Sequence, residues 1–272
     1  MCRLSPDGVL SCFGKNHDGT VGDGTASPRA TAFVHTGRWR AVTAGPRDTC
    51  GVRDDGTLWC WGRHAGWKPT KVSPDSDWSE TALGFSLPIA LKTDGSLWVW
   101  QNTFVHPTRV SRIDGTWRSF SMGLFEGTCL ETVDGHQRCS PSPLHSQRGA
   151  QVIDLGVTGP VAIWANEVFI VVEGKLQRGA LPYSGAVTWR DEPVPFEVDR
   201  VLTGTRRCAH GVSGALFCWE RDGVNGGFFP GVTLSGRWAA FAPGDGLTCA
   251  QDSQTDETWC FDELSAAPRL VE

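Results

Sequence analysis

The ten cysteines of this 272-residue chain are the side chains whose spacing most clearly predicts chemistry. Two thiols can be oxidised to a disulfide, whereas a structural zinc site needs four converging ligands with short Cys-x2-4-Cys spacing. That zinc spacing is absent from the sequence, so the pattern favours disulfides. The cysteines form five pairs separated by ten or eleven positions: Cys2 with Cys12, Cys50 with Cys60, Cys129 with Cys139, Cys208 with Cys218, and Cys249 with Cys260.

Each pair brackets a turn signal that predicts a β-hairpin. Between Cys50 and Cys60, two apolar-rich runs flank the Asp-Asp-Gly sequence at 54–56, which is typical of a type I turn followed by a left-handed glycine. This loop pairs Arg53 with Thr57, and counting outward places Cys50 opposite Cys60. Directly opposed residues of an antiparallel ladder lie about 4.5 to 5.5 Å apart at Cα, which overlaps the window that a disulfide needs.

Two related stretches lack both cysteines of the pair. Ile89 and Val99 take the two positions in one stretch, and the equivalents in the other lie near Val168 and Arg178. Partners that are lost together indicate a cross-strand bridge, because lone structural cysteines could vary independently. In the last cysteine pair, the extra residue predicts a four-residue loop at 253–256.

The hairpins belong to a unit that repeats about every 39 to 41 residues, a period typical of solenoids and propellers. Short strands with glycine-rich turns favour a propeller blade of about four strands. Seven hairpins therefore predict an all-β fold, a seven-bladed β-propeller built from repeats of about 40 residues. A tryptophan, or a substitute, followed six positions later by glycine precedes the hairpins: Trp39 with Gly45, Trp78 with Gly84, Trp117 with Gly123, Ile153 with Gly159, Val198 with Gly204, and Trp238 with Gly244.

We expect a single β-propeller domain over residues 1–272, because no linker interrupts the repeat. Its first blade is expected to be incomplete at the N-terminus, since the chain starts inside a blade at Met1 and lacks the preceding tryptophan-glycine strand. After positions 268–271 the chain stops where that strand would begin. This favours a fragment of a longer open reading frame over ring closure by another segment.

The second unit resembles the repeat of the regulator of chromosome condensation (RCC1) family. That repeat consists of tryptophan, valine and alanine-glycine, then a hairpin ending in tryptophan-glycine, and WRAVTAGPRDTCGVRDDGTLWCWG at 39–62 matches it. The segment NHDGTVGDGT at 16–25 is similar to the part that follows in the family. The resemblance covers essentially the full chain and implies a seven-bladed propeller, in agreement with the hairpin count. The founding family member is a guanine nucleotide exchange factor, and the family includes a secreted β-lactamase inhibitor protein.

Composition and charge restrict the cellular compartment and the classes of partner that we expect. The net charge of −5 and the pI near 5.8 argue against broad binding to nucleic acid, although a local basic patch is predicted around Arg200, Arg206 and Arg207. No run of about 18 apolar residues exists, so we expect no direct membrane insertion. Disulfides persist in oxidising compartments, which predicts an extracytoplasmic location: secreted, periplasmic or cell-surface. No signal peptide is visible, and a missing upstream segment would supply it.

No set of residues predicts catalysis. The seven histidines fall in no metal-binding box and are expected to be scattered loop residues. Asp18 and Asp23 lie in a glycine-rich segment that lacks the alternating aspartates of a calcium loop. The acidic residues Asp252, Asp256 and Glu257 are expected at a hairpin tip. We therefore expect no enzyme activity, no cofactor and no metal site.

The loop after each hairpin predicts a binding surface, because equivalent loops of a propeller emerge on the same face. If exposed, large side chains there form a ring of interface anchors. The alternative is burial, since the leucine at this position in the family packs between blades, and Leu144 falls here in blade four. The candidate binding residues are Trp67, Phe104, Tyr183, Phe228 and Phe229.

These observations predict a non-catalytic extracytoplasmic scaffold that binds an unidentified protein partner through one propeller face and acts as a monomer. A secreted enzyme inhibitor is the main alternative, because the family includes one. A carbohydrate-binding module is a further alternative, since exposed tryptophans stack on sugar rings. Guanine nucleotide exchange is disfavoured, because the GTPases that accept it are cytosolic and the disulfides are not expected there.

Overall fold

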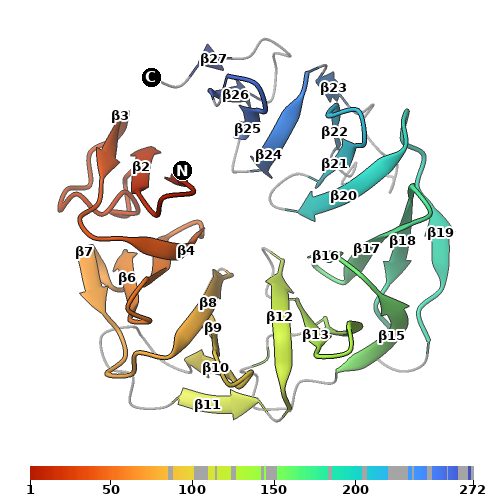
Figure 1. Cartoon of the computed structure of the whole chain (residues 1–272), viewed down its shortest axis with the longest axis horizontal. Coiled ribbons are helices and arrows are strands. Elements are labelled where there is room, and N and C mark those ends of the chain that lie inside the picture. Colours follow the sequence, from red (N-terminus) through yellow and green to blue (C-terminus); the bar gives the residue numbers. More distant parts are fainter. Residues whose placement is uncertain are drawn as a thin grey trace.

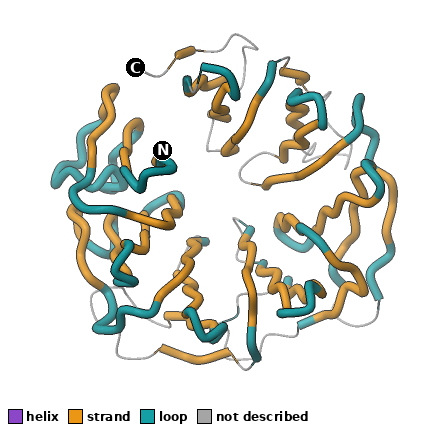
Figure 2. Tube along the Cα trace, viewed as in Figure 1, coloured by secondary structure: helices purple, strands orange, loops and turns teal. Residues whose placement is uncertain are grey.

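The computed structural model describes residues 1–84, 88–100, 110–113, 115–123, 127–141, 144, 152–182, 186–203, 207–219, 232–234, 236–243, 247–255, 257–262 and 269–270. Their strands form seven separate antiparallel sheets arranged as a ring (Figure 1). Within these residues every regular element is a strand (Figure 2). The prediction of an all-β, seven-bladed propeller is confirmed.

The blades follow the chain order. Blade one contains β1 (Cys2–Leu4), β2 (Leu10–Gly14) and β3 (Arg29–Val34), and blade two contains β4 (Trp39–Ala44), β5 (Asp48–Arg53), β6 (Leu58–Gly62) and β7 (Gly66–Lys71). Blade three contains β8 (Trp78–Leu83), β9 (Pro88–Lys92), β10 (Leu97–Trp100) and β11 (Val110–Ile113), and blade four contains β12 (Trp117–Met122), β13 (Thr128–Thr132), β14 (His136–Ser140) and β15 (Ile153–Thr158). Blade five contains β16 (Val161–Trp164), β17 (Glu167–Val172), β18 (Lys175–Ala180) and β19 (Trp189–Asp191). Blade six contains β20 (Val198–Thr203), β21 (Arg207–Gly211), β22 (Leu216–Trp219) and β23 (Val232–Leu234), and blade seven contains β24 (Trp238–Pro243), β25 (Leu247–Asp252), β26 (Thr258–Asp262) and β27 (Arg269–Leu270).

The first strand of each four-stranded blade lies nearest the centre of the ring and the fourth strand lies at the rim (Figure 1). Blade one has three strands, and β1 corresponds to the second strand of the other blades. All three residues of β1 are half-buried, whereas the first five of β5 are buried. The first strand of a blade thus contributes much of the cover over the second.

The tryptophans that open the inner strands fill the wedges between blades. Trp39, Trp78, Trp117 and Trp238 are at most 7% exposed. Trp39 packs edge-on against Trp61, with ring centroids 5.7 Å apart. An aromatic ring of this size buries roughly 150–250 Å², which at about 25 cal/mol per Å² stabilises the fold by up to about 4–6 kcal/mol.

One assignment of the repeat is wrong. Ile153 does not open an inner strand, because β15 pairs with β14 as the outer strand of blade four. The inner strand of blade five is β16, which joins β17 through a two-residue turn at Ala165 and Asn166. Since Ala165 adopts a left-handed φ of 53°, the chain reverses at once and the inner strand needs only four residues. The segment upstream is therefore left to complete blade four.

All five predicted disulfides are present, and together they use every cysteine of the chain. Each joins directly opposed residues of a hairpin, with the Cα atoms 4.0–4.1 Å apart. The bridges are Cys2 to Cys12, Cys50 to Cys60, Cys129 to Cys139, Cys208 to Cys218, and Cys249 to Cys260. The register that was counted from the turn at 54–56 is therefore confirmed in every cysteine-bearing hairpin.

Two further details of the hairpins agree with the sequence. Ile89 faces Val99 in blade three, at the position where the other hairpins carry the bridge. In the last hairpin the Asp252 amide donates to the Glu257 carbonyl at 2.9 Å, which closes the predicted four-residue loop.

The register of blade five differs by one position from the prediction. Val168 faces Gly179, and Arg178 faces Phe169. The cause is the hairpin loop, which has two residues, Glu173 and Gly174, both with positive φ, instead of three. A loop shorter by one residue shifts every pair on one strand by one position.

Candidate functional site

The loops that join the third and fourth strands of successive blades share one end of the ring, because strand direction alternates within each sheet. We call this end the loop face. Its described segments include 15–28 after β2, 63–65 after β6, and parts of the connection after β18. The tips of the hairpins between second and third strands lie on the opposite face.

Trp67 is the one predicted binding residue within the described part of the chain. It is the second residue of β7 and is 49% exposed. The other predicted anchors, Phe104, Tyr183, Phe228 and Phe229, lie outside the described residues. Leu144 in blade four is only 6% exposed and packs with the core, so the burial alternative holds at that blade.

The Trp67 ring lies against the 15–28 loop. Gly19 has a left-handed φ of 76°, and a Cβ built on it would stand 2.3 Å from Trp67 Cδ1. Only glycine allows this approach, because any side chain at position 19 would displace the ring. The Gly24 amide donates to the Trp67 carbonyl at 2.9 Å, and the Lys68 stem passes over Gly24. The sequence of the loop therefore sets where Trp67 lies.

Buried polar contacts hold this loop in place. Asn16 is fully buried, and its Nδ2 donates to the carbonyls of Thr25 at 2.9 Å and Ser27 at 3.1 Å. Its Oδ1 accepts the Val21 amide at 2.9 Å. One side chain thus joins three points of the loop, which fixes its shape before any ligand binds.

The same loop is tied to its surroundings by charge and by blade two. Burial acts to raise the pKa of Asp23, but hydrogen bonds from neighbouring groups and from Arg29 outweigh it and lower the pKa. Arg29 Nη1 lies 3.1 Å from the Asp23 carboxylate. Thr49 Oγ1 and Trp61 Nε1 both donate to the Thr20 carbonyl at 2.8 Å. The platform under Trp67 is consequently part of the rigid core.

Polar side chains lie on the two segments next to Trp67, the 63–65 turn and the 15–28 loop. Arg63 and Asp18 form an ion pair at 3.7 Å across the edge of the loop. His64 Nδ1 lies 2.7 Å from the buried Asp48 carboxylate, which also accepts the His64 amide at 2.8 Å. An aromatic anchor with a charged rim is the usual composition of a binding surface. We call Trp67, Lys68, Arg63, His64 and Asp18 the Trp67 patch.

The opposite face also exposes apolar side chains, a feature that the sequence did not indicate. Val133, Val172 and Val212 lie at the hairpin tips of blades four, five and six and are 59%, 40% and 61% exposed. Blade two carries Asp54 at the matching position, paired with Arg38 at 3.2 Å. This face therefore presents apolar side chains at blades four to six and an ion pair at blade two.

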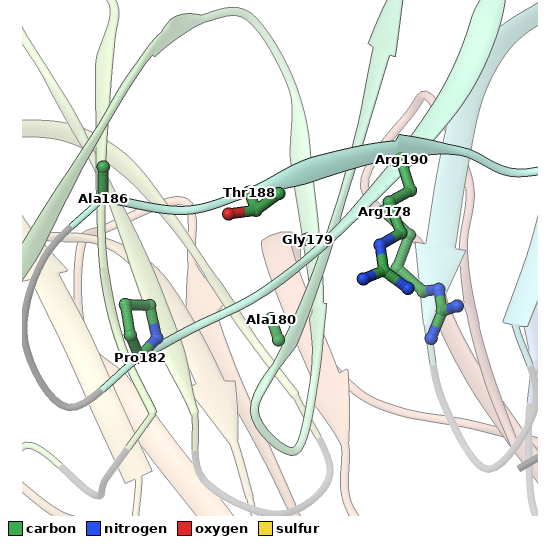
Figure 3. A pocket seen from close by; sticks show the side chains of 7 residues that line it. All are labelled: Arg178, Gly179, Ala180, Pro182, Ala186, Thr188 and Arg190. Atoms are coloured by element: carbon green, nitrogen blue, oxygen red, sulfur yellow. The ribbon is translucent and has the colours of Figure 1, made fainter.

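Blade five contains a pocket of about 310 Å³ between β18 and β19 (Figure 3). Two guanidinium groups lie at one end, and small apolar side chains and a threonine hydroxyl line the remainder. The lining residues are Arg178, Gly179, Ala180, Pro182, Ala186, Thr188 and Arg190.

A buried ionic cluster lies behind this pocket and joins blades five and six. Arg178 contacts Glu167 at 2.7 Å and Glu192 at 2.9 Å, and Arg207 of β21 contacts Glu167 at 3.0 Å. The Arg207 guanidinium also lies 3.9 Å from the centre of the Trp164 ring. Burial raises the pKa of Glu192, and its contact with Arg178 offsets this only in part.

The predicted basic patch is wrong at Arg207, which is 2% exposed and faces Glu167 rather than solvent. Arg200 lies partly buried over the Phe241 ring, and Arg206 lies outside the described residues. Two histidines depart from the expectation of loop residues, since His136 lies in β14 and His210 lies in β21. His35 lies in a loop, as expected, but is only 5% exposed. Burial lowers the pKa of His35.

Sequence reasoning missed the ionic cluster of blade five. Its members are 11 to 40 residues apart, and no spacing distinguishes them from solvated charges. Among the described residues, no group of three or more His, Cys, Asp or Glu side chains is placed to hold a metal ion. In the same part of the chain, we find no helix of the length and hydrophobicity that a membrane span requires.

No protein-family model matches the sequence, and no curated protein matches it. Solved structures do match. Human WBSCR16 is 13% identical, with 97% of this chain and 93% of that chain covered and a TM-score of 0.73. Prp20p from Saccharomyces cerevisiae, whose structure was reported with its binding to Gsp1p and histones, is 12% identical over 100% of this chain and 87% of that chain, with a TM-score of 0.77.

A third match is the CRINKLY WD40 ectodomain of the Arabidopsis thaliana receptor kinase ACR4. It is 16% identical over 100% of this chain and 96% of that chain, with a TM-score of 0.63. At these identities the likeness establishes the fold. Prp20 is the yeast RCC1, so the resemblance to the RCC1 repeat is confirmed at the level of the propeller fold.

Proposed function

We propose that this chain is a non-catalytic, extracytoplasmic protein-binding scaffold that engages its partner through the Trp67 patch. The observation that carries the proposal is the half-exposed Trp67 ring, held over a loop that buried hydrogen bonds keep rigid. Tryptophan and arginine dominate the binding energy of protein interfaces. A preformed anchor also costs less conformational entropy on binding than a flexible one.

The disulfides support the extracytoplasmic part of the proposal. Five bridges that use every cysteine are typical of oxidising compartments and rare in reducing ones. The ACR4 neighbour provides a second line of support, because a propeller of this fold serves there as the ectodomain of a receptor kinase.

Protein binding is supported by the fold and by the chemistry of the patch. Prp20p binds Gsp1p and histones with the same fold, yet 12% identity transfers no partner to this chain. An inhibitor is a binding scaffold whose partner is an enzyme, so a secreted hydrolase is the first partner to test. Exchange activity on a cytosolic GTPase remains disfavoured by the disulfides.

The experiment places a photo-crosslinking amino acid at the exposed position of Lys68, beside the intact Trp67, and, in a second sample, at Val212 on the opposite face. Both proteins are incubated with the extracytoplasmic fraction of the source and irradiated, and adducts are identified by mass spectrometry. We expect a specific adduct from position 68 that excess wild-type protein suppresses and excess Trp67→Ala does not. Adducts from position 212 alone, or equal suppression by both competitors, would contradict the assignment.

Carbohydrate binding is the second candidate, favoured by a half-exposed tryptophan beside Asp18 and His64. Aromatic rings of this kind present an apolar face to a ligand, and flanking polar groups supply hydrogen bonds. A glycan array with wild-type protein and Trp67→Ala separates the two candidates. A Trp67-dependent glycan signal without a protein adduct would favour the carbohydrate function.

A further inference from the structure

Two arginines of blade five occupy directly opposed positions. Arg178 of β18 faces Arg190 of β19 in the antiparallel ladder, and both side chains line the 310 Å³ pocket (Figure 3). Like charges opposite each other on one face of a sheet are destabilising. Such a pair is tolerated when other groups, or a bound anion, neutralise it.

The protein neutralises only one of the two arginines. Arg178 directs Nη1 to Glu167 and Nε to Glu192, and its side chain is 25% exposed. Arg190 is exposed, and within the described residues no hydrogen bond or ion pair engages its guanidinium. Among the described residues, the carboxylates of Glu167 and Glu192 contact Arg178 and Arg207, and none contacts Arg190.

The rest of the pocket indicates the shape of the missing anion. Ala180, Pro182 and Ala186 form an apolar wall, and Thr188 contributes a hydroxyl that can donate a hydrogen bond. A volume near 310 Å³ lies at the lower end of the range for ligand sites. The pocket therefore suits a small group with an anionic end and a short apolar stem.

We propose that this pocket binds a carboxylate, with the oxygens held by the Arg190 guanidinium beside Arg178 and the stem against Ala180 and Pro182. Arginine is suited to this role because its planar fork donates two parallel hydrogen bonds to a carboxylate. The ligand class is a small aliphatic carboxylate, either free or as the acidic side chain or C-terminus of a peptide. The site lies across the ring from the Trp67 patch (Figure 1) and does not depend on it.

The test uses propionate as the probe, with propionamide as its neutral counterpart and inorganic phosphate as a non-planar anion. Each is titrated into the whole chain at low ionic strength, and amide shifts are followed by two-dimensional NMR. We expect propionate to shift Thr188, Gly179 and Ala180, with a Kd on the order of millimolar for so small a ligand. Propionamide is expected to bind at least about tenfold more weakly, because it lacks the negative charge that pairs with the Arg190 guanidinium.

Arg190→Gln is the variant that tests the role of Arg190. The residue is exposed, so the variant is expected to fold, and we expect its Kd for propionate to rise about tenfold. Arg237→Gln is the matched control, an exposed arginine of the opposite face whose loss should leave the Kd unchanged. A peptide ending in a free carboxylate, compared with its amidated form, distinguishes a peptide terminus from a free acid.

Three outcomes would overturn the proposal. The first is propionate binding that leaves the pocket amides unshifted. The second is equal propionate affinity in wild type and Arg190→Gln. The third is phosphate binding at the pocket more tightly than propionate, which would contradict the carboxylate assignment.

Discussion

Blade two and blade five lie on opposite sides of the ring and hold the same pair of strands together by different means (Figure 1). In blade two the second and third strands are joined covalently by the bridge between Cys50 and Cys60. Arg53 adds to this, since its guanidinium lies 4.9 Å from the Trp39 ring centre and 4.2 Å from that of Trp59. The tie in blade two therefore depends on redox state.

Blade five has Val168 and Gly179 at the disulfide position. Its strands are tied by the buried cluster in which Arg178 joins Glu167 to Glu192, and Arg207 extends the tie to blade six. Ion pairs respond to pH and to the loss of a partner rather than to reductant. Both blades thus join the second strand to the third, but the disulfide links directly opposed residues, whereas Glu167 and Arg178 are not opposed in the ladder. The pair of strands is the same in the two blades, and the chemistry and the register position of the link differ.

The largest effect is expected from breaking the cluster of blade five. Glu167→Gln removes the charge that faces both the half-buried Arg178 and the buried Arg207, so that each guanidinium loses one carboxylate contact. Removal of one member of a buried ion pair costs roughly 3–5 kcal/mol in the free energy of unfolding. Urea denaturation measures this, and Glu173→Gln, at the exposed hairpin tip of the same blade, is the control. A loss under about 1 kcal/mol would show that the cluster does not hold the blade.

The next effect is expected from removing the bridge of blade two. The double change Cys50→Ile and Cys60→Val installs the residues that blade three carries at the same positions, Ile89 and Val99. The loop-entropy model predicts a loss of about 2–3 kcal/mol, reduced if the new side chains pack well. The midpoint of urea denaturation should fall. Reductant should then lower the midpoint of the variant less than that of the wild type, because the bridge of blade two is already absent. An unchanged midpoint would indicate that the isoleucine and valine pair stabilises the hairpin as well as the disulfide does.

A smaller effect is expected from the pH dependence of Glu192, at the end of blade five. Burial raises the folded-state pKa of Glu192 above its ordinary value of 4.5. Below 4.5 the group is protonated in both states, and as the pH rises through the folded pKa the buried carboxyl must ionise, so stability falls. Glu192→Gln removes this penalty. The free energy of unfolding of the variant, relative to that of the wild type, should therefore increase as the pH rises from 4.5. A difference in unfolding free energy that is constant with pH would contradict this.

The smallest effect on stability is expected at Trp67. Its ring is half exposed, so Trp67→Ala should lower the free energy of unfolding by less than about 1 kcal/mol while abolishing partner crosslinking. Trp67→Phe is the control, because it keeps an aromatic ring on Gly19. Cooperative unfolding that is lost in Trp67→Ala would assign the residue to the core instead of to a surface.

The sequence predicted most of the fold because the repeat fixes both strand period and turn type. The Asp-Asp-Gly loop at 54–56 determined the register, and the cysteine pairs followed from it. The prediction was wrong where a turn departs from the repeat. Ala165 and Glu173 adopt a left-handed φ that glycine usually takes, and alanine and glutamate are not residue types that predict this conformation. These two residues explain the misplaced inner strand and the shifted register of blade five.

The candidate site was less predictable, since exposure depends on packing between distant segments. Trp67 is held by Gly19, and the two are 48 positions apart. Arg207 looked like part of a basic surface because its partner Glu167 lies 40 residues away. A charge count along the sequence cannot separate such a buried pair from solvated side chains.

The disulfides, and the extracytoplasmic role that depends on them, are tested by a count of free thiols in protein isolated from its native source. The protein is denatured and alkylated, with and without prior reduction, and its intact mass is measured. We expect all ten cysteines to resist alkylation until the protein is reduced. Alkylation of all ten without reduction would contradict the bridges and, with them, the extracytoplasmic role.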